Sequence, residues 1–153
     1  FIKDKYLLML LPDDLIIKKN CSKSMINVHQ KYKSSVMASM QVNKSTVSRW
    51  GIFNLSKRLS KSDYLISDVV EKPSIKDAPS NKAVIGRYIL PKTIFKKLKN
   101  QNFGNGGEIH ITDAIQSLIK DNENFIAHNF SGKYLDCGTM NGYINSGKKI
   151  GNL

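Results

Sequence analysis

The stretch "KYLLMLLPDDLIIKKNCSKSMINVHQKYKSSVMASMQV", residues 5–42, decides the fold class. Its opening run, "KYLLMLL", is continuously apolar and predicts a strand that is buried on both faces and ends at Pro12. The segment "CSKSMINVHQKYK" then places Met25 and Val28 at helical spacing, with Ser22 as the predicted N-cap. The run "SSVMASMQV" predicts a second strand. A strand, a helix and a strand in this order are typical of a parallel βαβ unit.

The rest of the chain continues the alternation of strands and helices. The runs "WGIFNL" and "YLISDVVE" predict two strands joined by a polar, basic turn, and "KAVIGRYIL" and "NFIAHNF" predict two more. Helices are expected for "PKTIFKKLKN", "ITDAIQSLIK" and the tail "TMNGYINSGKKIG". Loops are expected for the proline-containing segment 73–81 and for the glycine-rich "QNFGNGG", residues 101–107. The residues therefore predict an α/β chain with a mixed sheet.

Length and charge narrow the classes of protein. The chain has 153 residues, which suits one domain, and a net charge of +12. That charge suggests nucleic-acid binding, but the basic residues are spread along the chain and no recognition motif accompanies them. An anionic small ligand is also compatible with the charge. We therefore expect no nucleic-acid partner, and keep a basic nucleic-acid-binding domain as an alternative.

Hydropathy and cysteine usage bear on location. No apolar run reaches the roughly 20 residues that a membrane helix needs, and no signal peptide is visible. The two cysteines, Cys21 and Cys137, lie far apart in the sequence. Their spacing favours reduced thiols over a disulfide and gives no metal-binding pattern. We expect a cytoplasmic protein that does not bind a membrane.

Acidic residues stand at two expected element ends. In "LLPDDLII", Asp13 and Asp14 follow a predicted strand, at the edge where ligands bind in open α/β sheets. Carboxylate oxygens are the ligands that Mg²⁺ prefers. In "GGEIHITDAI", Asp113 begins a helix and could be a second carboxylate for the same ion. The alternatives are a polar turn at Asp13 and Asp14, and an acid at Asp113 that complements the helix dipole.

A second group of polar candidates lies in "VVEKP", residues 69–73. Glu71 can accept hydrogen bonds from sugar hydroxyls, because an ionised carboxylate is a strong acceptor. Lys72 can hold a phosphate as a point charge. The alternative is a solvated pair of surface charges. In "SRWGIF", Gly51 permits close approach of a ligand to the backbone, and the alternative is a bulge or a strand start.

Taken in order, several motifs resemble one family. "LLPDD", the Trp-Gly-Ile step, "VEKP", "APSNKAVIGRYIL", "GGEIHITDAI" and "DCG" resemble the bacterial UTP–glucose-1-phosphate uridylyltransferases (UDP-glucose pyrophosphorylases), which are sugar nucleotidyltransferases. The resemblance covers nearly the whole chain, from about Leu10 to Tyr143. Trp50 departs from the family's usual Tyr, His110 from its Gln, and "KYLDCG" from its "KRYDCG". The resemblance implies an α/β Rossmann-like nucleotidyltransferase fold with a mixed, mainly parallel sheet flanked by helices.

The same resemblance implies binding roles for residues that match its motifs. Gly51 and Val84 would contact the sugar, and Glu71 would bind the glucose hydroxyls. Lys72 would contact the phosphate and serve as a catalytic residue. Asp13, also catalytic, would bind Mg²⁺ together with Asp113.

The implied reaction joins UTP to glucose 1-phosphate by in-line attack on the α-phosphate, giving UDP-glucose and pyrophosphate. The family's opening loop, G-x-G-T-R, has no counterpart in residues 1–153. The resemblance therefore implies the C-terminal, sugar-binding and metal-binding part of a single nucleotidyltransferase domain, which forms a homo-oligomer when full length. Two alternatives are a catalytically incomplete fragment that only binds sugar phosphate, and a thymidylyl- or cytidylyltransferase acting on another sugar 1-phosphate.

Overall fold

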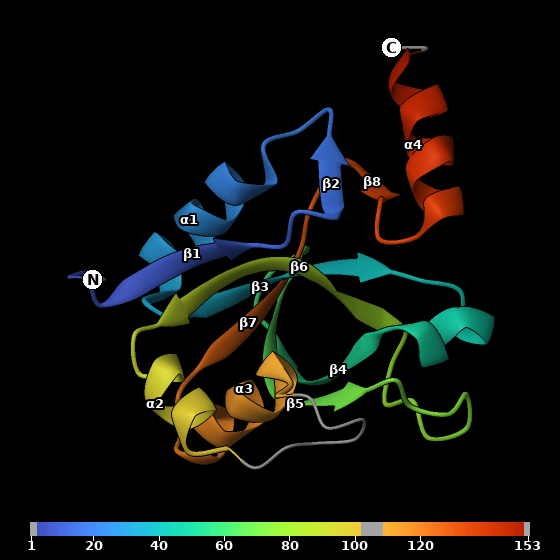
Figure 1. Ribbon diagram of the computed structural model, residues 1–153. Helices are drawn as coiled ribbons and strands as arrows, with labels where there is room; N and C mark the ends of the chain where they lie inside the picture. The colour runs from blue at the N-terminus through green and yellow to red at the C-terminus, as the bar shows by residue number, and fades with distance from the viewer. Residues whose placement is uncertain (1–2, 102–108, 152–153) are drawn as a thin grey trace.

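The computed structural model describes residues 3–101 and 109–151 (Figure 1). Most of the predicted glycine-rich loop, residues 101–107, lies outside these ranges. The strands are β1 (Tyr6–Leu10), β2 (Asp14–Ile17), β3 (Ser35–Gln41), β4 (Gly51–Arg58), β5 (Asp63–Glu71), β6 (Lys82–Pro91), β7 (Phe125–Asn129) and β8 (Lys133–Asp136). The helices are α1 (Cys21–Tyr32), α2 (Ile94–Lys99), α3 (Ile111–Lys120), α4 (Met140–Gly151) and the 3₁₀ helix η1 (Lys44–Arg49).

Six strands form one mixed sheet in the order β1-β6-β3-β7-β5-β4. A single pairing of Ile52 with Ala83 also joins β4 to β6, so that five strands close into a small barrel-like ring. Within the described ranges only β3 and β7 pair in parallel, and every other pairing is antiparallel. The prediction of a mixed sheet is confirmed, but "mainly parallel" is wrong. Parallel neighbours need long crossovers, whereas a short turn links β4 to β5.

The predicted βαβ unit is present but interrupted. β1 and β3 run in the same direction and are connected through α1, yet β6 lies between them and is antiparallel to both. Ile89 of β6 stands opposite Leu8 on one side and Val36 on the other. β1 is consequently an edge strand, with Leu8 38% and Leu10 49% exposed. The expectation that β1 is buried on both faces is therefore wrong.

Helices cover both faces of the sheet, α1 on one and α2 with α3 on the other (Figure 1). β6 serves both cores, because successive side chains of a strand point to opposite faces. Val84 and Tyr88 pack in the core beneath α2 and α3, while Ile85 and Ile89 pack beneath α1. α1 begins two residues earlier than the predicted N-cap Ser22 implies, because the Asn20 side chain caps it by accepting a hydrogen bond from Lys23 N.

A buried polar contact ties three elements together. His128 Nδ1 of β7 lies 2.7 Å from Asp63 Oδ1 of β5, and its Nε2 lies 3.0 Å from Ser24 Oγ of α1. Ser60 Oγ donates to the other oxygen of Asp63 at 2.7 Å. Both oxygens of the Asp63 carboxylate therefore have hydrogen-bonding partners. These partners offset the cost of removing the carboxylate from water.

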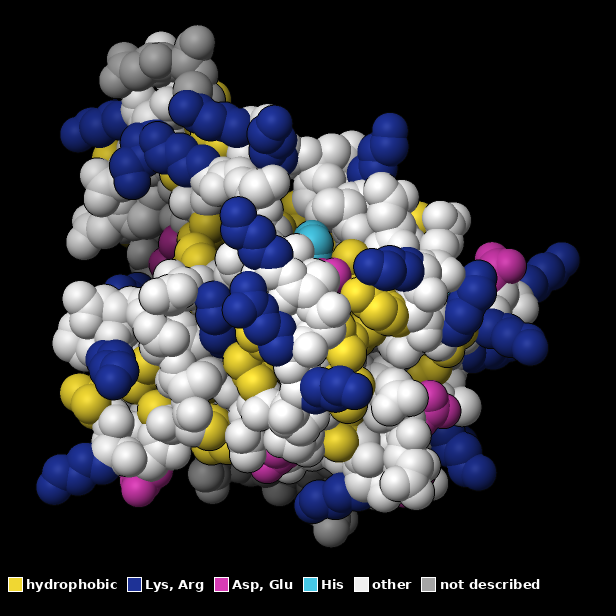
Figure 2. Space-filling model, turned by 180° about the vertical axis from the view of Figure 1, so that it is seen from behind, with side chains coloured by type: hydrophobic (Ala, Val, Ile, Leu, Met, Phe, Trp, Pro, Cys, Tyr) yellow, Lys and Arg dark blue, Asp and Glu magenta, His cyan; other side chains and the backbone are white. Residues whose placement is uncertain are grey.

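The surface and the thiols agree with the sequence patterns. Figure 2 shows Lys and Arg side chains scattered over one face of the molecule, with uncharged and hydrophobic atoms between them. Cys21 and Cys137 are both free thiols, as expected. In the part of the chain that the structure describes, no helix is both long enough and apolar enough to cross a membrane.

Candidate functional site

A cavity of about 230 Å³ opens where β4 starts, β5 ends and α3 begins. We call it the Glu71 cavity. Its lining comes from the β1–β2 connection, η1, β4, β5, β6 and the start of α3, and consists of Leu11, Asp14, Arg49, Trp50, Gly51, Glu71, Val84, Gly86, Tyr88, His110, Ile111 and Thr112. Three of the predicted sugar contacts therefore share this cavity, although they come from three different strands.

Gly51, Glu71 and Val84 meet at a single point. Gly51 and Glu71 stand directly opposite each other in the β4–β5 pairing, which places their side-chain positions on the same face. A Cβ built on Gly51 would lie 3.1 Å from Glu71 Oε2 and 3.2 Å from Val84 Cγ2. Only a glycine leaves this space open, so the backbone of β4 is accessible beside an acceptor and an apolar wall.

Lys72 lies one residue beyond the Glu71 cavity and is absent from its lining. Its φ of 45° is in the left-handed region, and its N–H donates to Trp50 O at 3.0 Å. Such a conformation is uncommon for a residue other than glycine and costs on the order of 1 kcal/mol. The following Pro73 adds a further restriction. The structure holds Lys72 in this bend at the end of β5, where its backbone is fixed and its side chain is exposed.

The family resemblance implies no role for Asp14, but the structure makes it the main polar link in the wall of the cavity. Asp14 Oδ2 accepts a hydrogen bond from Gly86 N at 2.5 Å, and Oδ1 accepts one from the Tyr134 hydroxyl. Tyr134 in turn packs edge-on against Trp50, with ring centroids 5.8 Å apart. The β2–β8 ribbon is thereby fastened to β6 and to the start of β4. Gly86 is the sequence signal for this contact, since glycine inside a strand often marks a close approach.

Negative charge concentrates around the buried phenol of Tyr88, which lines the cavity. Burial raises the pKa of Tyr88 far above its ordinary value, and the charges of Asp14, Glu71 and Asp13 raise it further. Asp13 is therefore close enough to the cavity for its charge to act on Tyr88. A group of carboxylates around one cavity favours a cation there.

The predicted metal ligands, Asp13 and Asp113, both lie beside residues of the cavity lining and not in it. Asp13 is exposed between β1 and β2, where its carbonyl accepts from Cys137 N at 2.8 Å. Asp113 lies in the first turn of α3 and accepts a hydrogen bond from Gln101 Nε2 at 3.2 Å. No cluster of three or more His, Cys, Asp or Glu suited to a metal occurs in residues 3–101 and 109–151. The hard carboxylate oxygens and the local negative charge nevertheless fit Mg²⁺, which commonly takes one or two carboxylates together with substrate phosphates.

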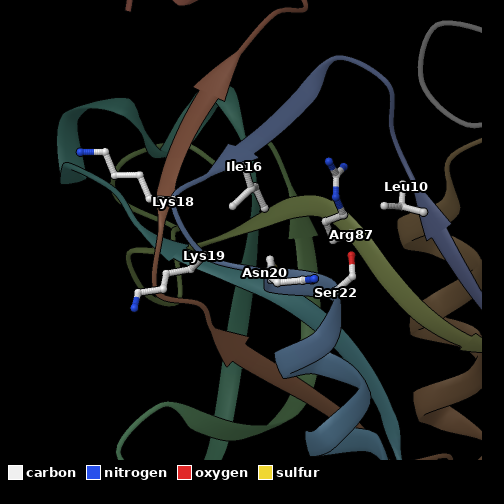
Figure 3. A pocket seen from close by; sticks show the side chains of 8 residues that line it. Leu10, Ile16, Lys18, Lys19, Asn20, Ser22 and Arg87 are labelled. Carbon is white, nitrogen blue, oxygen red and sulfur yellow. The ribbon is translucent and has the colours of Figure 1, made fainter. Parts of the chain in front are cut away.

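A larger hollow of about 440 Å³ lies on another part of the surface, lined in part by Lys18, Lys19 and Arg87. Figure 3 shows the two lysine side chains extending away from the arginine. The arginine itself donates from Nη1 to Leu11 O and Gly86 O, each at 3.0 Å. The positive charges do not converge and none of the predicted site residues lies there, so the Glu71 cavity is the better candidate.

Comparison with known proteins identifies the family. Residues 1–152 match the family described as Nucleotidyl transferase. The chain belongs to this nucleotidyl transferase family. It is 38% identical over 146 residues to UTP–glucose-1-phosphate uridylyltransferase of Pseudomonas aeruginosa, which covers 94% of the chain and 52% of that protein. The corresponding enzyme of Mycoplasma genitalium is 33% identical over 146 residues, covering 94% of the chain and 50% of that protein.

Solved structures give the same assignment to the nucleotidyl transferase fold. A crystal structure of UDP-glucose pyrophosphorylase complexed with UDP-glucose has a TM-score of 0.91 at 39% identity, covering 99% of the chain and 58% of that protein. A UTP-bound UGPase from Acinetobacter baumannii has a TM-score of 0.78 at 31% identity, covering 94% and 50%. The chain therefore spans about half the length of these relatives. The predicted resemblance and the α/β nucleotidyltransferase fold are confirmed.

Proposed function

We propose that residues 1–153 are the sugar-binding and metal-binding part of a single nucleotidyltransferase domain. Its complete form would be an enzyme that makes UDP-glucose and pyrophosphate from UTP and glucose 1-phosphate. The observation that carries the proposal is the meeting of Gly51, Glu71 and Val84 at one point of one cavity. Relatives named for this activity support the choice of uridylyl transfer.

The cavity residues suggest how the sugar phosphate is held. Glu71 accepts hydrogen bonds from ring hydroxyls, and the bare backbone at Gly51 and the side chain of Val84 contact the apolar face of the ring. Lys72, next in sequence to Glu71, neutralises the phosphate on the same substrate. An acid and a base side by side thus match a ligand whose hydroxyls and phosphate are adjacent. A phosphate oxygen of glucose 1-phosphate then attacks the α-phosphorus of UTP in line, and the bond from that phosphorus to the β-phosphate oxygen breaks, so that pyrophosphate leaves. This reaction depends on positioning and charge neutralisation.

Asp13 and Asp113 would hold Mg²⁺, which when bound neutralises the phosphates brought together for the reaction. The residues present favour this role through their donor chemistry and through the negative charge that Asp13, Asp14 and Glu71 exert on Tyr88. We assign no metal-binding role to Asp14, whose carboxylate oxygens accept hydrogen bonds from Gly86 N and the Tyr134 hydroxyl and so fasten β2 to β6 and β8.

A calorimetric titration of glucose 1-phosphate into this chain, with Mg²⁺ present, tests the sugar site. Glu71→Gln removes the charge with little change in shape and should weaken binding by roughly 10-fold to 100-fold, the range for a hydrogen bond to a charged group. Glu123→Gln is the matched control, because Glu123 follows α3 and lies outside the cavity lining. Equal loss in both variants, or none in Glu71→Gln, would contradict the proposal.

Turnover must be measured in a longer protein, one that also contains the half of the nucleotidyltransferase that the relatives have and residues 1–153 do not span. There, Lys72→Ala should lower turnover by on the order of 100-fold, as expected for a preorganised charge contact. Lys76→Ala, in the exposed loop after β5, should leave turnover unchanged. If residues 1–153 bind glucose 1-phosphate but the longer protein forms no UDP-glucose, the alternative of a sugar-phosphate-binding fragment is correct.

Assembly and location remain predictions of the sequence. We propose that the full-length protein is a cytoplasmic homo-oligomer. α4 extends away from the sheet (Figure 1) and exposes Met140 by 74% and Tyr143 by 66%. Large apolar side chains on such a helix are a suitable contact for a second subunit.

A further inference from the structure

Thr112 carries a hydroxyl that the protein itself leaves unsatisfied. The residue is only 6% exposed, and its Oγ1 has no hydrogen-bond partner among the described residues. Buried polar groups in native proteins nearly always have partners, so each exception calls for an explanation. The other unsatisfied buried side-chain atoms in residues 3–101 and 109–151 are Ser35 Oγ, Ser39 Oγ and Gln101 Oε1. Of this set only Thr112 lines the Glu71 cavity.

The position of Thr112 is fixed by the packing of α3. It is the second residue of this helix, whose ten residues begin at Ile111. Gln116, one turn further along, donates from Nε2 to Val69 O and so fastens α3 to β5. Ala114, Ile115 and other residues of α3 are buried in the same core as Val69. A rigid helix therefore holds Thr112 at the cavity into which β5 brings Glu71.

We propose that the Thr112 hydroxyl, which is buried in the free protein, turns about χ1 into the Glu71 cavity and there hydrogen-bonds a ring hydroxyl of the bound hexose 1-phosphate. Threonine in a helix uses two χ1 rotamers, so this turn needs no change in the backbone. This inference rests on the proposed function, which places the sugar in the Glu71 cavity. The chemistry is complementary: the carboxylate of Glu71 only accepts hydrogen bonds, whereas a threonine hydroxyl both donates and accepts. A sugar hydroxyl that donates its proton to Glu71 still has two lone pairs that can accept a hydrogen bond. The Thr112 hydroxyl can donate to one of them. Binding then satisfies a protein group that is unsatisfied in the free protein, which makes Thr112 a determinant of sugar specificity.

The test compares Thr112→Val, which keeps the shape and removes the hydroxyl, with Thr112→Ser, which keeps the hydroxyl. Titration of α-D-glucose 1-phosphate should show affinity about fivefold to tenfold lower in Thr112→Val, the loss of one hydrogen bond, and recovered in Thr112→Ser. Without ligand, Thr112→Val should melt about 2–4 °C higher, because an unsatisfied buried group has been removed. Ser35→Ala is the control: it also removes an unsatisfied hydroxyl, but one outside the cavity lining, and should leave affinity unchanged.

A series of glucose 1-phosphates, each lacking one ring hydroxyl, identifies the bonded group. The compound that lacks the hydroxyl bonded by Thr112 should bind the unaltered protein and Thr112→Val with equal affinity, because it cannot form the hydrogen bond in either protein. Equal affinity of Thr112→Val and the unaltered protein for glucose 1-phosphate itself would overturn the inference. So would a penalty that persists across the whole series, or a lower melting temperature in Thr112→Val. If the unaltered protein does not bind glucose 1-phosphate at all, the proposed function fails first, and this inference fails with it.

Discussion

Gly51→Ala adds one methyl group at the point where the predicted sugar contacts meet. The new Cβ would lie 3.1 Å from Glu71 Oε2 and 3.2 Å and 3.5 Å from Val84 Cγ2 and Cβ. Carbon contacts are optimal at about 3.5–4.0 Å, so these neighbours must move by a few tenths of an ångström. Val84 is 8% exposed, and its neighbours in β6, Ala83 and Ile85, are fully buried or nearly so. The exposed Glu71 side chain must therefore move, and the carboxylate leaves its position beside the cavity.

Overpacking of this kind typically costs about 1–3 kcal/mol. We expect most of it to appear in ligand affinity, because the flexible Glu71 can relieve the clash in the free protein but not while it holds a sugar. Glucose 1-phosphate should therefore bind roughly 5-fold to 150-fold more weakly. The backbone of Gly51 is not in the left-handed region, so alanine adds no backbone strain. The lower entropy of the unfolded chain contributes about 0.4–1 kcal/mol of compensating stability.

Calorimetric titration together with thermal denaturation separates these two effects. Gly147→Ala is the matched control, because a Cβ on Gly147 in α4 meets nothing within 4 Å. It should stabilise the protein by roughly 0.5–1 kcal/mol, as alanine does in a helix, and should not change affinity. If Gly51→Ala binds glucose 1-phosphate as tightly as the unaltered protein, the sugar does not approach β4 at this point, and the reasoning from convergence is refuted.

Three further changes test the fold. Gly86→Ala places a methyl group against the carboxylate of Asp14 and should lower the unfolding free energy, measured by urea denaturation, by at least about 2 kcal/mol. A loss below about 0.5 kcal/mol would contradict the observed close approach. Asp63→Ala removes the hydrogen-bond partner of His128 Nδ1 and of Ser60 Oγ and should cost about 1.5–3 kcal/mol per lost hydrogen bond. Asp121→Ala, which breaks an ion pair with a 55% exposed carboxylate, should cost less than about 1 kcal/mol; equal losses would argue against the buried contact. Burial raises the pKa of Cys21 from 9.0 to about 11, so the unfolded chain loses the thiol proton at lower pH than the folded protein does. The unfolding free energy should therefore fall as the pH rises from about 9 to about 11, and it should fall less steeply in Cys21→Ala. Identical pH profiles of the two proteins would refute this.

The local elements were predictable because they depend on neighbours in sequence. The periodicity around Met25 and Val28 predicts α1, and the apolar runs predict β3 to β7. Strand partners depend on distant residues, and no local pattern shows that β6 inserts between β1 and β3. A continuous apolar run is typical of a central strand, yet the run at residues 5–11 forms the edge strand β1. The ribbon of β2 with β8 is held by Asp14 and Tyr134, a contact across 120 positions that periodicity does not reveal.

The site was predictable only in part. The motif resemblance selected Gly51, Glu71 and Val84, and the structure brings these three together. Thr112 could not be predicted as a site residue, because a single threonine in the first turn of a helix is common in sequences. Its significance lies in a missing hydrogen-bond partner and in the shape of the cavity, and both exist only after folding. The roles of Asp13, Asp113 and Lys72 stay predictions, since they concern a metal ion and phosphates.

The central claim is that the Glu71 cavity binds the sugar of glucose 1-phosphate. The most direct measurement is a titration of glucose 1-phosphate, with Mg²⁺, followed through the backbone amide resonances of the labelled chain. We predict saturable shifts centred on Gly51, Glu71 and Thr112, with the amides that surround Lys18 and Lys19 unchanged. Shifts confined to those lysines, or no saturable shift at any amide, would contradict the account.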